Sequence, residues 1–214
     1  ALIVVFQPNE LSKTTMNRTI IIAEAGVNHN GDMNIAHRLI DAAADAGVDY
    51  VKFQTFKTEN LVSCDAPTAE YQKSATNETS QFAMLKRLEL SETQHLELID
   101  YCRQKGVKFL STAFDLDSID LLSRFDLDFW KIPSGEITNY PYLVKIARTS
   151  KPVVMSTGMC DLADVKNALD VLTENGVKTE DLTLSHCNTQ YPTPMADVNL
   201  NATITPAGTF GVKT

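Results

Sequence analysis

The sequence has no CxxC pair, although it contains four cysteines, and this absence argues against a zinc knuckle and a redox pair. Single cysteines scattered along a chain are typical of reduced thiols, so we expect a cytoplasmic protein. The sequence also lacks any run of Lys or Arg, and its net charge of −8 argues against a nucleic-acid-binding surface. Any bound anion must therefore be held by a few placed cations, by helix N-termini or by a metal.

Long apolar runs are missing as well. The segment ALIVVF at residues 1–6 has six apolar residues and no basic flank, which is too short for a signal peptide or a membrane span. Met16 stands directly before the first convincing strand. We therefore expect residues 1–15 to be an extension outside the fold and residues 16–214 to form one incomplete barrel domain.

Strand patterns alternate with helix patterns from residue 19 onward. This alternation predicts an α/β protein with a parallel sheet wrapped by helices, of the (β/α)8 TIM barrel type. Because a whole barrel typically needs ~250 residues, we expect about six of its eight units here. The alternative is a doubly wound open sheet, but EAGVNHNG at residues 24–31 is not the GxGxxG turn of that fold. The predicted strands are Thr19–Glu24, Asp49–Gln54, Val107–Thr112, Asp128–Pro133, Pro152–Thr157 and Asp181–Cys187.

Two of the expected helices carry boundary signals. Ser91 and Gln94 have the spacing of a capping box, and Gly106 is a typical stop for the helix that follows. Another helix is expected to begin at Asp161 and to end near Gly176. These signals fix where two of the predicted helices begin and end.

The connection formed by residues 55–90 is unusually long. Loops longer than about 15 residues are usually functional or disordered, and this one follows a strand end on the active face of a barrel. It is either a surface insertion or a lid. As a lid, it would contact ligand through Tyr71, Gln72 and Lys73.

Two lysines stand within apolar strand patterns. Lysine is almost never fully buried unless it is paired, so Lys52 and Lys131 indicate a functional site more than a solvated face. Their natural partners are Glu24, Glu136 or an anionic ligand. By contrast, His37 and His95 lie in helix sequence and are expected to be structural.

Polar groups end all six predicted strands. A single Ser or Thr at such a place is usually a helix cap, so it is the whole set of polar strand ends that indicates a functional site. Two lysines with Ser and Thr hydroxyls at helix N-termini suit a phosphate and a carboxylate. Phosphoenolpyruvate carries both groups on three carbons. A histidine and a glutamate at the rim add a metal ligand or a proton donor.

Six segments in this order closely resemble the sialic acid synthase family, which comprises N-acetylneuraminate and legionaminic acid synthases. The resemblance runs from about Thr19 to Val212. These enzymes condense phosphoenolpyruvate with an N-acylated amino sugar. The segments are Ile20–Asp32, Val51–Lys57, Phe109–Asp115, Lys131–Glu136, Met155–Met159 and Leu184–Pro194.

The resemblance implies a TIM barrel, a divalent cation (Mn²⁺ or Mg²⁺) and a homodimer in which a C-terminal antifreeze-like domain caps the partner's site. That domain and the strand with the family's second metal histidine are not in this chain. Glu24, Glu136 and His186 would be catalytic, and His186 would also bind the metal. The substrate-binding residues would be Lys52, Gln54, Thr112, Lys131, Ser134, Ser185, Asn188 and Tyr191.

Several functions stay open at this point. The first choice is condensation of phosphoenolpyruvate with N-acetylmannosamine to give sialic acid and phosphate. The alternative is a legionaminic or pseudaminic acid synthase that uses a 2,4-diacetamido sugar. A Schiff-base pyruvate aldolase or lyase is a second alternative, and an inactive ligand-binding remnant is the alternative that is not an enzyme.

Overall fold

The structure is a computed structural model that describes residues 3–6, 19–63, 80–190 and 193–214. The chain divides into two compact units, one of residues 25–122 and the other of residues 1–24 together with residues 123–214. In each unit, parallel strands alternate with helices along the chain. The predicted α/β class is therefore confirmed.

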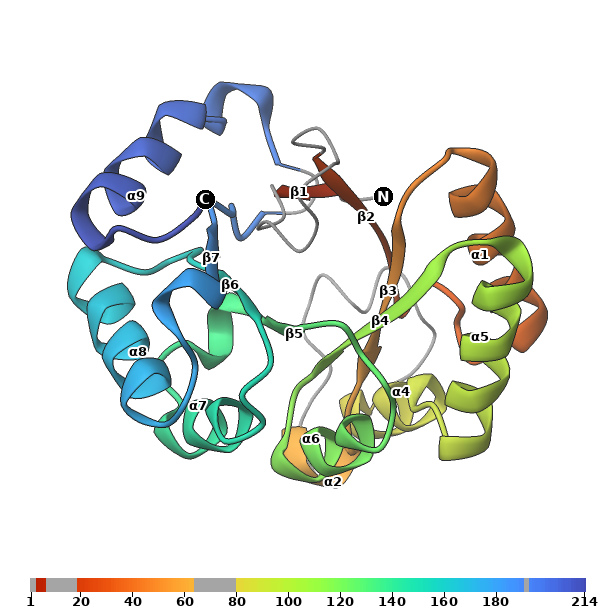
Figure 1. Cartoon of the computed structure of the whole chain (residues 1–214). Helices are drawn as coiled ribbons and strands as arrows, with labels where there is room; N and C mark the ends of the chain where they lie inside the picture. The colour runs from red at the N-terminus through yellow and green to blue at the C-terminus, as the bar shows by residue number, and fades with distance from the viewer. Residues whose placement is uncertain (1–2, 7–18, 64–79, 191–192) are drawn as a thin grey trace. The chain divides into compact units, whose positions relative to one another are not determined.

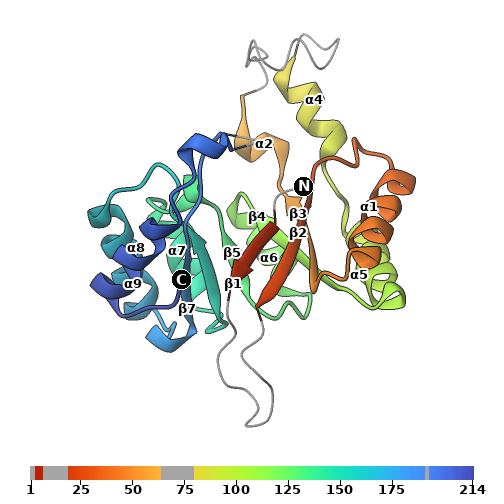
Figure 2. The same ribbon diagram turned by 90° about the horizontal axis from the view of Figure 1, so that it is seen from above.

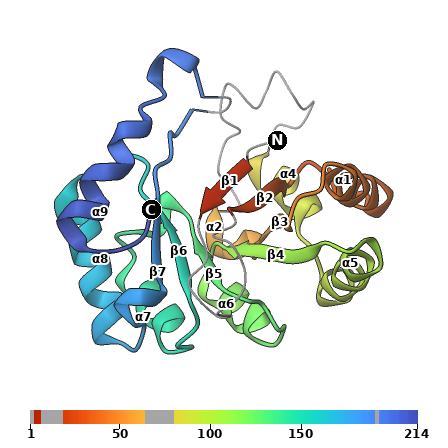
Figure 3. The ribbon, with the colours of Figure 1, turned by 45° about the horizontal axis from the view of Figure 1, so that its top comes forward.

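The unit of residues 25–122 is built on two parallel strands, β3 and β4. Tyr50 lies opposite Lys108 at one end of the pair, and Thr55 lies opposite Ala113 at the other. Helices α1 and α5 pack against each other beside these strands (Figure 3). The elements of this unit are α1 (Met33–Asp45), β3 (Tyr50–Thr55), α2 (Thr58–Leu61), α4 (Gln81–Leu88), α5 (Glu92–Lys105), β4 (Lys108–Ala113) and α6 (Leu116–Ser123).

The two faces of β3 and β4 differ in chemistry. Successive strand residues point to opposite faces, so Phe53 and Thr55 share one face and Lys52 and Gln54 share the other. Thr55 contacts His95 of α5, which identifies the first face as the one that packs on the helices. The lysine face is therefore turned away from α5.

The other unit contains three parallel strands in the order β5–β6–β7 (Figure 1). Helices α7 and α8 pack against each other, and Trp130 of β5 donates from Nε1 to Oγ1 of Thr149, just beyond α7, at 2.8 Å. A parallel bridge joins Thr183 to Lys213. The elements are β5 (Trp130–Ile132), η1 (Ser134–Glu136), α7 (Tyr140–Ala147), β6 (Val153–Ser156), α8 (Leu162–Glu174), η2 (Thr179–Asp181), β7 (Leu182–Ser185), η3 (Met195–Asp197), η4 (Leu200–Thr203) and α9 (Ile204–Phe210).

The predicted helix boundaries are confirmed. Ser91 and Gln94 form a reciprocal capping box at the start of α5, and Gly106 ends that helix with a φ of +75°. Asp161 caps α8 through the backbone N–H groups of Ala163 and Asp164. Each cap satisfies backbone donors that have no partner inside a helix, so these residues fix the ends of the two helices.

Four residues of the segment that we expected to lie outside the fold form a strand in the structure. Residues Ile3–Phe6 form strand β1, which pairs antiparallel with β2 (Ile20–Gly26), Ile3 lying opposite Ala23 and Phe6 opposite Ile20. A sheet edge presents free backbone donors and acceptors, and a β-branched apolar segment is well suited to pair with it.

The predicted long loop also differs from the structure. Helix α2 lies at its beginning and α4 near its end, and the two helices contact each other (Figure 2). Tyr71, Gln72 and Lys73, the expected contact residues of a lid, fall outside the described residues. Within the described parts of the chain, no helix is long and apolar enough to cross a membrane.

Candidate functional site

Lys131 lies in the middle of β5 and is buried, with 5% of its surface exposed. Its Nζ donates to the carbonyl oxygen of Ile132 at 3.0 Å and to Oγ of Ser156 at the end of β6. Ser156 is buried to the same degree. The two neutral acceptors hold the ammonium in a fixed direction at the strand ends, where an anionic group can bind it.

The turns that follow β5 and β6 meet at Gly158. The backbone N–H of Gly158 donates to Oγ of Ser134 at 2.9 Å. A Cβ atom at position 158 would lie 3.0 Å from that oxygen and 3.2 Å from the carbonyl oxygen of Cys187. Glycine is therefore needed for this close approach, which places the predicted ligand residue Ser134 beside the loop after β7.

The ends of β6 and β7 are joined by further contacts. The backbone N–H of Thr157 donates to the carbonyl oxygen of Ser185 at 3.1 Å. Sγ of Cys187 donates to Oγ of Ser156 at 3.2 Å and lies 3.5 Å from Oγ of Ser185. Two predicted residues, Lys131 and Ser185, thus belong to one cluster of polar side chains, linked by Ser156 and Cys187. We call these four residues the lysine cluster.

Other predicted residues of this unit lie differently. Glu136 is half-buried and accepts a hydrogen bond from Nδ2 of Asn139 at 2.7 Å, at the start of α7. Asn188 accepts from the backbone N–H of Gln190 at 3.2 Å. Glu24 is half-buried within β2, and Tyr191 falls outside the described residues.

The unit of residues 25–122 holds a second group of predicted ligand residues. Lys52 is buried with 6% of its surface exposed, and Thr112 is buried with 2% exposed. Gln54 pairs with Thr112 across β3 and β4, so all three residues lie on the face turned away from α5. Oγ1 of Thr112 has no hydrogen-bond partner within the described part of the chain. A buried hydroxyl without a hydrogen bond lowers the stability of the fold unless a ligand or water bonds to it.

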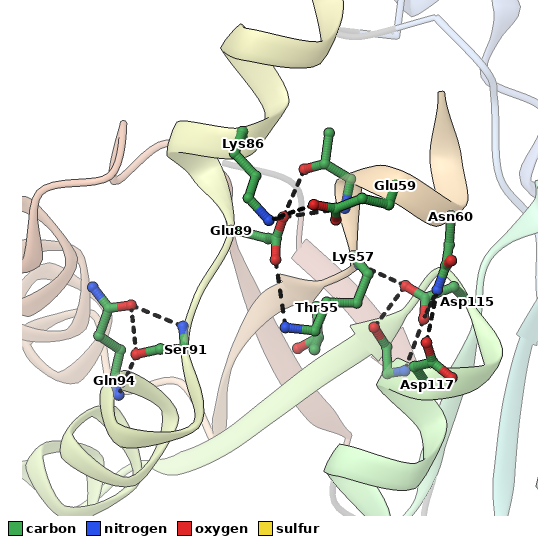
Figure 4. Close-up of polar contacts among 12 residues, drawn as sticks. Thr55, Lys57, Glu59, Asn60, Lys86, Glu89, Ser91, Gln94, Asp115 and Asp117 are labelled. Atoms are coloured by element: carbon green, nitrogen blue, oxygen red, sulfur yellow. Dashed lines mark hydrogen bonds and ion pairs between the residues drawn. The ribbon is translucent and has the colours of Figure 1, made fainter. Parts of the chain in front are cut away.

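Two carboxylates hold the start of α2, close to the end of β3 (Figure 4). Glu89 accepts from the backbone N–H of Thr58 at 3.1 Å and from its hydroxyl at 2.8 Å. Asp115 accepts from the backbone N–H of Lys57 at 2.7 Å and from the hydroxyl of Ser118 at 2.7 Å. We call Glu89 and Asp115, with these donors, the α2 clamp. Because carboxylates occupy these donors, the start of α2 is not a site for a substrate anion.

The buried histidines of this unit each have a hydrogen-bond partner, although Nε2 of His29 has none within the described residues. His95 contacts Oγ1 of Thr55 and the carbonyl oxygen of Ser91, each at 2.8 Å, as expected for a structural residue. His29 accepts from the backbone N–H of Gly31 at 3.0 Å through Nδ1. Burial, together with the charge of His95, lowers the pKa of His29, and burial lowers the pKa of His95. Both shifts disfavour the charged form of these imidazoles.

The described residues do not fit a metal centre. His186 is exposed and lies directly after the end of β7, between Ser185 and Cys187. Among the residues that the structure describes, no group of three or more His, Cys, Asp or Glu side chains could hold a metal ion. Since a bound metal usually needs about three protein ligands, His186 alone does not make a site.

Comparison with known proteins identifies the class. The NeuB family model matches residues 39–214, so the chain belongs to the NeuB family. It is 53% identical to N,N'-diacetyllegionaminic acid synthase of Campylobacter jejuni over 87% of the chain and 56% of that protein. It is 48% identical to the enzyme of the same name from Legionella pneumophila, over 89% of the chain and 54% of that protein. The chain therefore spans about half the length of these curated relatives.

A solved structure supports the same conclusion. The crystal structure of an N-acetylneuraminic acid synthetase from Leptospira borgpetersenii matches 97% of this chain and 69% of that one, with a TM-score of 0.77 and 27% identity. The predicted resemblance to the sialic and legionaminic acid synthases is thus confirmed.

Ser156 and Cys187 belong to the polar groups at the ends of the predicted strands, but neither was predicted as a site residue. A lone serine at such a place is usually a helix cap, and a single cysteine is typical of a reduced thiol. One signal was available. Lys131, Ser156 and Ser185 each lie at or near the end of a neighbouring parallel strand, and such ends share one edge of a sheet.

Proposed function

We propose that this chain carries the phosphoenolpyruvate-binding part of a nonulosonic acid synthase, built on a (β/α)8 TIM barrel of which it supplies about six of the eight units. The observation that carries the proposal is the buried Lys131 beside Ser156, at the ends of parallel strands in a NeuB family member. An ammonium and hydroxyl donors suit the phosphate or the carboxylate of phosphoenolpyruvate.

We propose a 2,4-diacetamido sugar as the second substrate, with a legionaminic acid as product. This revises the first choice from the sequence, N-acetylmannosamine. The two relatives near half identity are both legionaminic acid synthases, whereas the N-acetylneuraminic acid synthetase of known structure is about half as similar. Pseudaminic acid synthesis uses the same chemistry and is the next candidate.

The proposed reaction begins when C3 of phosphoenolpyruvate attacks the aldehyde carbon of the open-chain sugar. A carbon–carbon bond forms, the aldehyde oxygen takes up a proton and becomes a hydroxyl, and C2 gains positive character. Water then adds to C2, and the tetrahedral intermediate loses phosphate by cleavage of its C–O bond. The products are one 2-keto acid and one phosphate.

In this scheme Lys131, Ser134, Ser156 and Ser185 bind and orient phosphoenolpyruvate. Lys52 and Thr112 form a second donor pair, of which the Thr112 hydroxyl still needs a partner within the described residues.

The remaining assignments come from the family resemblance. Glu24 and Glu136 are proposed to move protons, and Gln54, Asn188 and Tyr191 to contact substrate. The same resemblance implies a divalent cation and a homodimer. Because the described residues do not assemble a metal centre, no step is assigned to a metal.

The test measures phosphate release from phosphoenolpyruvate with a panel of amino sugars. It should use this chain and a version extended to the length of its relatives. We expect release that depends on a 2,4-diacetamido sugar. Release with N-acetylmannosamine alone would restore the first choice.

Two further outcomes decide between the rival classes. A covalent adduct at Lys131 or Lys52 after borohydride treatment with pyruvate would indicate a Schiff-base aldolase. Binding of phosphoenolpyruvate without turnover in the extended protein would indicate a ligand-binding remnant. The similarity to the NeuB family favours the synthase over both rivals.

A further inference from the structure

The thiol of Cys187 lies between two hydroxyls of the lysine cluster. Its Sγ donates to Oγ of Ser156 at 3.2 Å and contacts Oγ of Ser185 at 3.5 Å. The thiol is half-buried, and Ser156 is 5% exposed. These distances are within the range of hydrogen bonds that involve sulfur.

The hydrogen atoms of this group can be assigned by counting. Oγ of Ser156 accepts two hydrogen bonds, one from Nζ of Lys131 and one from Sγ of Cys187. A hydroxyl has two acceptor sites and one hydrogen, so both acceptor sites of Ser156 are filled. The hydroxyl hydrogen of Ser156 is then left to donate, and no acceptor for it is recorded among residues 19–63, 80–190 and 193–214.

The same count fixes the second contact. The one hydrogen of the Cys187 thiol is used toward Ser156, so at the 3.5 Å contact the hydroxyl of Ser185 donates and the sulfur accepts. The hydrogen bonds therefore run in one direction, from Ser185 through Cys187 to Ser156. Each member donates to the next, and the last donor is Ser156.

We propose that Cys187 is a positioning residue that turns the Ser156 hydroxyl into a donor for an anionic oxygen of phosphoenolpyruvate. This inference rests on the proposed function of the lysine cluster. An anion accepts hydrogen bonds only, so a hydroxyl whose acceptor sites are already filled is preorganised for it. Without the thiol, one acceptor site of Ser156 opens, and its hydrogen is no longer held toward the ligand.

The backbone around Cys187 is held without its thiol. Thr157 donates to the carbonyl oxygen of Ser185 through both its backbone N–H and its hydroxyl, at 3.1 and 3.3 Å. Removing the sulfur should therefore leave the strand ends in place. This separates the effect on the Ser156 hydroxyl from a general loss of structure.

The test compares four forms of the chain by titration calorimetry with phosphoenolpyruvate: the unchanged protein, Cys187→Ala, Cys187→Ser and Cys160→Ala. Cys160 is the matched control, because its thiol contacts the carbonyl oxygen of Gly158 and not Ser156. We expect Cys187→Ala to raise the Kd about three- to tenfold, the effect of losing one neutral hydrogen bond. Cys187→Ser should recover part of this loss, and Cys160→Ala should bind as the unchanged protein does.

Infrared difference spectra supply a second readout, which observes the Cys187 thiol directly. The S–H stretching band of Cys187 should shift when phosphoenolpyruvate binds, and Cys187→Ala should remove that change while Cys160→Ala keeps it. If the unchanged chain binds no phosphoenolpyruvate, the proposed function fails. If it binds, but Cys187→Ala binds equally well or the S–H band does not respond, the positioning role is overturned and the proposed function stands.

Discussion

Glu89→Ala should lower the stability of the folded chain by more than the loss of the ion pairs of Glu89 suggests. The Glu89 side chain is 11% exposed, and it accepts from the backbone N–H and the hydroxyl of Thr58, a residue with no exposed surface. A buried donor that loses its acceptor costs about 1–3 kcal/mol, so two such donors should cost about 2–4 kcal/mol where water enters only partly. In a chain of this size, each kcal/mol lowers Tm by about 2–4 °C.

The assay is thermal unfolding together with hydrogen exchange at the amide of Thr58. We expect Glu89→Ala to lower Tm and to speed exchange at this amide, while Glu89→Gln, which keeps an acceptor oxygen, should show a smaller effect. Glu59→Ala is the control, because Glu59 also binds Lys86 at 2.9 Å but its side chain is 54% exposed. The reasoning is refuted if Glu89→Ala is no more destabilising than Glu59→Ala.

Three further predictions follow from the two units. Lys131→Met should weaken phosphoenolpyruvate binding about ten- to 150-fold in titration calorimetry, because a charge-assisted hydrogen bond contributes about 1.5–3 kcal/mol; an unchanged Kd would remove Lys131 from the site. Burial lowers the pKa of His29 and of His95 from 6.5, so below that pH the unfolded chain takes up protons that the folded chain does not. Urea unfolding should therefore show stability falling as pH drops below about 6.5 toward the lowered values, and a flat profile there would contradict it. Mn²⁺ should bind this chain weakly, and His186→Ala should weaken its binding further. The electron spin resonance signal of free Mn²⁺ measures this binding. Tight binding that survives the substitution would place the metal ligands elsewhere.

Local signals in the sequence predicted much of this fold. The capping box of Ser91 and Gln94 involves residues three apart, so the sequence alone specifies it. The period of two in a strand placed Lys52 and Gln54 on one face of β3, and the register with β4 agrees. Lys52 and Lys131, which stand within apolar strand patterns in the sequence, are both buried in the structure.

Contacts between distant residues explain what the sequence did not show. Helix α2 has only four residues and was predicted as part of a loop, because a helix that short has little stability of its own. It is held by Glu89 and Asp115, which lie 31 and 58 residues away from Thr58 and Lys57. Strand β1 likewise exists through its pairing with β2, and no signal within residues 1–6 specifies that partner.

In the candidate site, the sequence indicated some of the residues that take part but not the direction of their hydrogen bonds. Residue type and strand position were enough to predict that Lys131 and Ser185 lie at the strand ends. They did not predict the direction of the hydrogen bonds, because a serine or a cysteine can both donate and accept. That direction is set by the one member of the lysine cluster that can only donate, the ammonium of Lys131, which fills one acceptor site of Ser156. The Cys187 thiol fills the other, so in the proposed site the ammonium of Lys131 and the hydroxyl of Ser156 would both donate to the same anion.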